Sequence, residues 1–101
     1  MKEVVWSSQA RGQYLSALTF LADRNEAAAA KLLERVESTT AALAVRPLGR
    51  PGYADDTFER IVQRTSYVIV FELAGDELRV LRFFHMSQNW RGWRDADVGP
   101  Q

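Results

Sequence analysis

The sequence has 101 residues, of which 47% are hydrophobic and 26% charged, and its 13 basic and 13 acidic side chains give a formal net charge of zero. This length predicts one small domain over residues 1–101, with a short polar tail from about residue 95. The absence of cysteine excludes disulfides, thiol catalysis and cysteine-based zinc sites, and the zero net charge argues against a nucleic-acid binder with a strong positive field.

No stretch reaches the roughly 20 apolar residues that span a bilayer, and no signal-peptide pattern opens the chain. We therefore expect a soluble, cytoplasmic protein that does not contact the membrane. Arginine supplies 11 of the 13 basic residues, and eight of these arginines follow residue 45. Arginine is suited to a planar, bidentate grip on phosphate or carboxylate, although an arginine-rich genome would give the same bias.

The first half of the chain predicts one strand and two helices. Glu3–Trp6 is a short strand with alternating apolar residues, and Ser7 or Ser8 is placed to cap the helix that follows. Asn25 interrupts the helical pattern and can cap a second helix. Because this break is so short, we expect the two helices to form an antiparallel hairpin. Mostly apolar residues recur at spacings of three and four in both helices, at positions 10, 14, 17, 18 and 21 and then 29, 32, 33, 36, 40 (a threonine) and 43.

The second half predicts strands. Two prolines and two glycines make residues 46–54 a loop. Strands are expected over residues 58–63, 67–71 and 78–84, the second of them central because it is almost continuously apolar. Gly75 lies in a hairpin turn over residues 74–77, where it is free to take a positive φ. The order β-αα-βββ predicts an α+β fold, with the helical hairpin packed on one face of a mainly antiparallel sheet.

Four segments resemble the RelE/ParE superfamily of toxins from type II toxin–antitoxin systems. VVWSSQARGQYLSAL is similar to the first strand and helix start of that superfamily, NEAAAAKLLERVESTTAAL to its second helix, and RPLGRPG to the loop that follows. SYVIVFELAGDELRVLRFFHMSQNW, residues 66–90, resembles its final hairpin most strongly. The resemblance covers about nine-tenths of the chain and implies the β-αα-βββ layout already expected from the residues.

The superfamily contains two activities, and the resemblance leaves both open. RelE-like members cut mRNA in the ribosomal A site, whereas ParE-like members bind and poison DNA gyrase without catalysis of their own. A cognate antitoxin, usually small and with a DNA-binding N-terminal region, neutralises either kind, so the complex rather than the toxin would contact DNA. Such pairs are associated with plasmid stabilization. A third possibility is an inactive protein that keeps the fold and only binds partners; a homodimer or hetero-oligomer is also open.

Cleavage of RNA requires a base, an acid and cations that stabilise the phosphorane. The lysines and C-terminal tyrosine that the RelE resemblance implies are missing, since residues 46–60 contain no lysine and no tyrosine follows Tyr67. This favours the ParE-like activity, with no cofactor, no metal and no favoured catalytic residue. Some RelE relatives use a glutamate, an arginine and a histidine instead. The candidates for that set here are Glu59, Arg60, Arg64, Arg82 and the single histidine, His85.

The same side chains are candidates for contacts with a protein partner. Arg60, Arg64 and Arg82 are either outward residues of an antiparallel sheet or anchors for acidic side chains of the antitoxin. Tryptophan close to a chain end is either packed back on the protein or presented to a partner. We therefore expect the C-terminal region to contact gyrase or the antitoxin, with the ribosome as the target in the alternative reading. The expected contact residues are Arg60, Arg64, Arg82, His85, Gln88, Trp90, Arg91 and Trp93.

Overall fold

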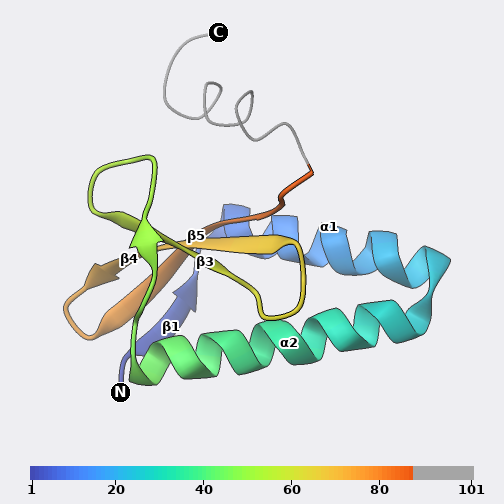
Figure 1. Ribbon diagram of the computed structural model, residues 1–101, viewed down its shortest axis with the longest axis horizontal. Helices are drawn as coiled ribbons and strands as arrows, with labels where there is room; N and C mark the ends of the chain where they lie inside the picture. Colours follow the sequence, from blue (N-terminus) through green and yellow to red (C-terminus); the bar gives the residue numbers. More distant parts are fainter. Residues whose placement is uncertain (88–101) are drawn as a thin grey trace, which may run out of the picture.

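The structure is a computed structural model that describes residues 1–87. Figure 1 shows a helical hairpin beside a twisted sheet, with the sheet lying toward the start of the first helix and the end of the second. The predicted order of strands and helices and the α+β class are confirmed, with one short strand added. The elements are β1 (Glu3–Trp6), α1 (Ser8–Arg24), α2 (Glu26–Val45), β2 (Arg50–Pro51), β3 (Thr57–Ile61), β4 (Tyr67–Ala74) and β5 (Glu77–His85).

The sheet has the strand order β1-β5-β4-β3-β2. Among the strands of residues 1–87, only the β1–β5 pair is parallel and the other pairs are antiparallel, so the expectation of a mainly antiparallel sheet is confirmed. The added strand β2 lies inside the segment expected to be a loop, where Arg50 pairs with Glu59 and Pro51 with Phe58. Proline is tolerated there because β2 is an edge strand, which does not require every backbone N–H.

Side-chain caps define the helical hairpin. Ser7, one of the two predicted caps, accepts a hydrogen bond from the backbone N–H of Ala10 at 3.0 Å. The Asn25 side chain accepts one from the N–H of Ala28 at 3.2 Å, as its position between the two helical patterns predicted. Each cap satisfies a backbone donor that has no partner within the helix. With a single residue between the helices, the chain reverses and α1 and α2 pack side by side.

The main core lies between the hairpin and one face of the sheet, which we call the helix face. Both helices and strands β3, β4 and β5 contribute to it, so the apolar stripes predicted for the helices meet the apolar strands. Its central side chains are almost completely buried: Leu32, Val36, Leu43, Val62, Ile69, Phe71, Leu78, Val80 and Phe83.

The β4–β5 hairpin contains two features that orient its side chains. Gly75 begins the turn with φ of 59°, the positive value that glycine adopts without steric cost. Farther along, Val70 pairs with Arg82 but Phe71 pairs with Val80, which leaves Leu81 as an extra residue in β5. This β-bulge lets Val80 and Phe83 both point into the main core although they are three residues apart. Within residues 1–87, no helix is long and apolar enough to cross a membrane.

Candidate functional site

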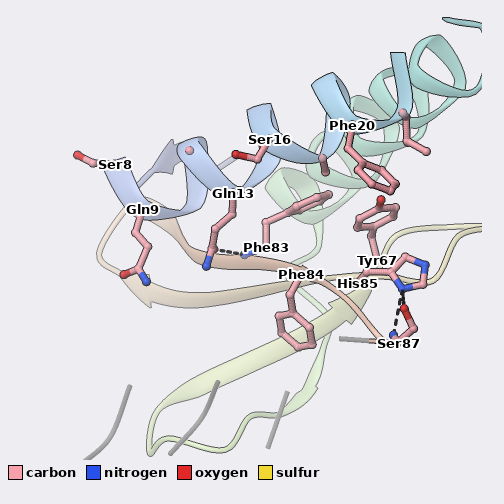
Figure 2. Close-up of a pocket in the computed structure, with 13 residues that line it drawn as sticks. Ser8, Gln9, Gln13, Ser16, Phe20, Tyr67, Phe83, Phe84, His85 and Ser87 are labelled. Atoms are coloured by element: carbon pink, nitrogen blue, oxygen red, sulfur yellow. Dashed lines mark hydrogen bonds between the residues drawn. The ribbon is translucent and has the colours of Figure 1, made fainter. Parts of the chain in front are cut away.

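A groove of about 980 Å³ runs along α1 and opens at the end of the β4–β5 hairpin. Figure 2 shows its lining residues, which come from α1 on one side and from β4 and β5 on the other. Ser8, Gly12 and Ser16 recur every four residues and so lie on one side of the helix. Because these residues are small, the helix leaves space there, and a Cβ atom added to Gly12 would meet nothing within 4 Å. We call this feature the α1 groove.

Aromatic side chains form the floor of the α1 groove and connect it to the core. Tyr67 stacks on Phe83 with ring centroids 5.1 Å apart and an interplanar angle of 13°. The ring centroid of Tyr14 lies 5.1 Å from that of Phe83, and Tyr14 also stacks on Trp6 with ring centroids 5.0 Å apart. Phe20, at the far end of the groove, is 53% exposed. The groove is therefore a partly exposed extension of an aromatic core, and its chemistry suits an apolar segment.

Gln13 explains how α1 is fixed against the sheet. Strand β1 ends at Trp6, so it supplies no ladder partner for the part of β5 beyond Val80. The Gln13 side chain supplies the missing acceptor, because its Oε1 accepts a hydrogen bond from the backbone N–H of Phe83 at 2.8 Å. A buried backbone donor without a partner would be costly. This bond therefore fixes the position of α1 and the width of the groove.

Burial keeps both tyrosines of this region neutral. Desolvation raises the pKa of Tyr14 to about 12, and the charge of Glu37 adds to the increase. Within residues 1–87, the buried Tyr14 hydroxyl has no hydrogen-bond partner. Burial also raises the pKa of Tyr67 above its ordinary value. Both phenols therefore stay protonated at neutral pH and cannot act as bases. They contribute mainly apolar ring surface to the groove.

His85 is held at the mouth of the α1 groove, at the end of β5. Its ring meets the Tyr67 ring edge-on, with centroids 4.8 Å apart. The imidazole Nδ1 accepts a hydrogen bond from the backbone N–H of Ser87 at 3.0 Å, and the Ser87 hydroxyl lies 2.6 Å from the same atom. Since Nδ1 is the acceptor of a backbone donor, the neutral ring carries its proton on Nε2. His85 thus has a fixed orientation beside apolar rings.

Glu59 and Arg82 lie on the opposite, open face of the sheet. The register aligns Glu59 with Val70 and Val70 with Arg82, so these three side chains project from the same face. Glu59 is only 6% exposed, and one of its oxygens lies 3.3 Å from a guanidinium nitrogen of Arg50. Figure 2 shows the two directions in β5, with Phe83 pointing toward α1 and Phe84 away from it.

The remaining candidates are separated from this pair. Arg60 aligns with Ile69 on the helix face, and its guanidinium donates to the Leu48 carbonyl at 3.0 Å. Arg64 lies in the loop after β3 with φ of 62°, and its carbonyl accepts a hydrogen bond from Arg35 at 3.1 Å.

The five residues considered for RNA cleavage are thus divided between the two faces and a loop, because neighbouring side chains of a strand alternate in direction.

The other expected contact residues, Gln88, Trp90, Arg91 and Trp93, lie outside the described residues. Within the described residues, no group of three or more histidine, cysteine, aspartate or glutamate side chains could hold a metal ion. The sequence signal that could have located the α1 groove is the spacing of small residues by four along the first helix, at Ser8, Gly12 and Ser16.

One family model matches most of the chain, and solved structures share its fold. Residues 4–90 match the family model described as "ParE toxin of type II toxin-antitoxin system, parDE". A solved structure described as the chromosomal ParDE TA system from P. aeruginosa has a TM-score of 0.75 and 18% identity, covering 86% of this chain and 98% of that one. A YoeB/ParE toxin from Agrobacterium tumefaciens has a TM-score of 0.57 and 17% identity, covering 82% and 96%. At these identities the structures show a shared fold. No curated protein matches the chain.

Proposed function

This chain belongs to the family of ParE toxins of type II toxin–antitoxin systems, and we propose that it acts in the cytoplasm by binding DNA gyrase and blocking its activity. In this proposal the protein has no catalytic step of its own. A cognate antitoxin neutralises it, and only the complex with the antitoxin contacts DNA.

The observation that carries this proposal is the separation of the acid–base candidates. General acid–base catalysis needs both groups within hydrogen-bond reach of one substrate. Glu59 projects from the open face and is paired with Arg50, whereas His85 projects from the helix face and is held by Ser87 and Tyr67. An RNA phosphate placed beside one of these groups would be shielded from the other by the sheet. This separation supports a binding inhibitor over a nuclease.

The α1 groove supports the antitoxin part of the proposal. Its aromatic floor is partly exposed, and its helical side is lined by small residues, so an amphipathic helix or an extended apolar segment fits there. Arg64 is exposed and Arg82 is half-buried. These two arginines, together with Arg60 and His85, are the described residues that we propose as partner contacts. Acidic side chains of an antitoxin would pair with them.

Ribosome-dependent cleavage of mRNA is the second candidate. It is favoured by the charge on the open face, where Arg50 neutralises Glu59 and Arg82 lies in the same cross-strand row. A carboxylate with two guanidinium groups is a reasonable set for proton transfer and for stabilising a phosphorane. In this alternative, Arg82→Ala would abolish mRNA cleavage.

Induced expression with two simultaneous readouts tests the proposal. Plasmid supercoiling and mRNA integrity are measured in the same cells after the chain is induced. We expect supercoiling to be lost or cleaved DNA to accumulate while mRNA stays intact. Rapid cleavage of mRNA with normal supercoiling, abolished by Arg82→Ala, would establish the nuclease instead. If neither readout responds, the chain is an inactive member of the family that only binds its partner.

A further inference from the structure

Strand β5 extends farther than the strand beside it on one of its edges. Strand β1 pairs with β5 only from Glu77 to Val80, whereas β4 accompanies the other edge of β5 as far as His85. Within the described part of the chain, residues 81–85 therefore have a strand partner on one edge alone. We call the side of residues 81–85 that faces away from β4 the β5 edge. An edge of this kind presents backbone groups that can pair with a further strand.

Side chains from the beginning of α1 take the hydrogen-bonding positions of the β5 edge. The hydroxyl of Ser7 donates to the Leu81 carbonyl at 3.3 Å, and Gln13 Oε1 accepts from the Phe83 N–H at 2.8 Å (Figure 2). The N–H of Met86, three residues beyond Phe83, points to the other edge and donates to the Ser66 carbonyl, as the alternation of a strand requires. Gln13 thus supplies the acceptor that a neighbouring strand would supply. Because it is a side chain, it can rotate away without a change in the backbone.

The α1 groove runs along the β5 edge. Its lining includes both Phe83 and Phe84, and these two side chains project from opposite faces of β5 (Figure 2). A groove that contacts both faces of one strand has to pass the edge of that strand. On the facing side of the groove, the space beside Gly12 is open. An incoming chain therefore has access to the N–H group that Gln13 now holds.

The hydrogen-bonding groups of the β5 edge favour an extended chain over a helix. Carbonyl groups inside a helix are already bonded to N–H groups of the next turn, so they cannot replace Gln13 as the acceptor. A strand directs backbone groups to its neighbour at every second residue, and its side chains alternate between the two faces of the sheet. One set of side chains would lie against the rings of Tyr67 and Phe83 and the other beside Phe84. Apolar side chains suit both positions.

We propose that an extended, apolar segment of the antitoxin adds a strand to the β5 edge inside the α1 groove, and that one of its backbone carbonyls replaces Gln13 Oε1 as the acceptor of the Phe83 N–H. This inference rests on the neutralising antitoxin of the proposed function and specifies how that partner is held. The added strand lies in line with β1 and continues the ladder that β1 begins, so β5 is paired on both edges over its whole length. Gln13 is then a positioning residue that keeps the edge bonded in the free protein.

Nuclear magnetic resonance of the complex tests this arrangement. The full chain is labelled with ¹⁵N and the antitoxin with ¹³C, and nuclear Overhauser contacts of the Phe83 amide proton are measured. We expect contacts to one backbone segment of the antitoxin whose own chemical shifts are those of a strand. The amide of Ser7, which donates to the Val80 carbonyl, is the internal control and should keep its contacts within the chain.

Two variants of Gln13 separate the free protein from the complex. Gln13→Leu removes the acceptor at a similar side-chain volume, whereas Gln13→Glu keeps an acceptor oxygen. In the free protein, exchange of the Phe83 amide hydrogen with solvent should accelerate by about tenfold or more in Gln13→Leu and change little in Gln13→Glu. In the complex, this amide should be equally protected in both variants and in the unaltered chain, because the antitoxin then supplies the acceptor.

Three results would overturn the inference while the antitoxin still binds, as measured by calorimetry. The first is fast exchange of the Phe83 amide in the complex of Gln13→Leu. The second is a helical antitoxin segment in contact with Phe83. The third is the same set of contacts between two differently labelled copies of the free chain, which would make a second copy the occupant. Absence of any binding would instead remove the antitoxin from the proposed function, and this inference with it.

Discussion

The two faces of the sheet differ in how their apolar residues are covered. On the helix face, the hairpin buries a continuous core, and the aromatic rings of Trp6, Tyr14 and Phe83 connect this core to the α1 groove. On the open face, a small cluster is buried beside the charged row of Glu59 and Arg82. The helix face therefore supplies most of the stability, and the open face combines apolar and charged groups in the way that interfaces do.

The strongest test of this difference compares two neighbouring residues of β4. Phe71 belongs to the main core, and Val70 belongs to a smaller buried cluster on the open face, which also contains Val68 and Phe84. Phe71→Ala should lower the free energy of unfolding by about 3–5 kcal/mol, because it leaves a large cavity. Val70→Ala removes two methyl groups and should cost only about 1–2 kcal/mol. Urea unfolding followed by circular dichroism measures both, and equal losses would show that the two faces contribute alike.

A substitution at Gly12 separates stability from partner binding. Because the space beside Gly12 is open, Gly12→Leu should stabilise α1 by up to about 1 kcal/mol through its higher helix propensity. The leucine side chain would project into the α1 groove and should weaken antitoxin binding about tenfold or more. Gly12→Ala is the matched control, with a similar gain in stability and less obstruction. Thermal unfolding and calorimetric titration with the antitoxin measure the two effects. Unchanged affinity in Gly12→Leu would place the antitoxin elsewhere.

The smallest expected effect at neutral pH concerns the Tyr14 hydroxyl. Its pKa is raised from 10.0 to about 12 in the folded protein, so the unfolded chain loses this proton at a lower pH. The stabilisation from the protonated phenol is complete below pH 10 and declines as pH rises from about 10 to about 12. Tyr14→Phe should change stability by less than about 0.5 kcal/mol at pH 7, because no hydrogen bond within residues 1–87 is lost.

The pH dependence of stability between pH 10 and pH 12 distinguishes the ionisation of Tyr14 from a general loss of structure at high pH. In Tyr14→Phe the decline between pH 10 and pH 12 should become shallower, and the remainder should include the contribution of Tyr67, whose pKa is also raised. Urea midpoints across this range give the comparison. An identical decline in both proteins would mean that Tyr14 ionises equally easily when folded and unfolded.

Much of the fold was predictable because local signals agreed with it. The strand Glu3–Trp6, the caps Ser7 and Asn25, and the turn at Gly75 were all predicted and are confirmed. Each depends on a residue whose chemistry acts on its immediate neighbours. The two-residue strand β2 was missed because its pairing with β3 depends on contacts distant in sequence.

The orientation of the candidate site residues could not be predicted. The bulge at Leu81 reverses the alternation within β5, so it decides that Arg82 and Phe84 project from the open face while Phe83 projects toward α1. Nothing in a run such as Leu78–Phe84 marks which residue is the extra one. The sequence therefore brought Glu59, Arg82 and His85 together as candidates, whereas the structure separates His85 from the other two.

A supercoiling reaction with purified components tests the central claim most directly. Relaxed plasmid, ATP and purified DNA gyrase are combined with increasing amounts of this chain, and a parallel reaction contains translating ribosomes and mRNA. The account predicts that supercoiling stops or that cleaved DNA accumulates, and that mRNA remains intact. Adding the antitoxin should restore supercoiling. Unaffected gyrase together with cleavage of ribosome-bound mRNA would contradict the account.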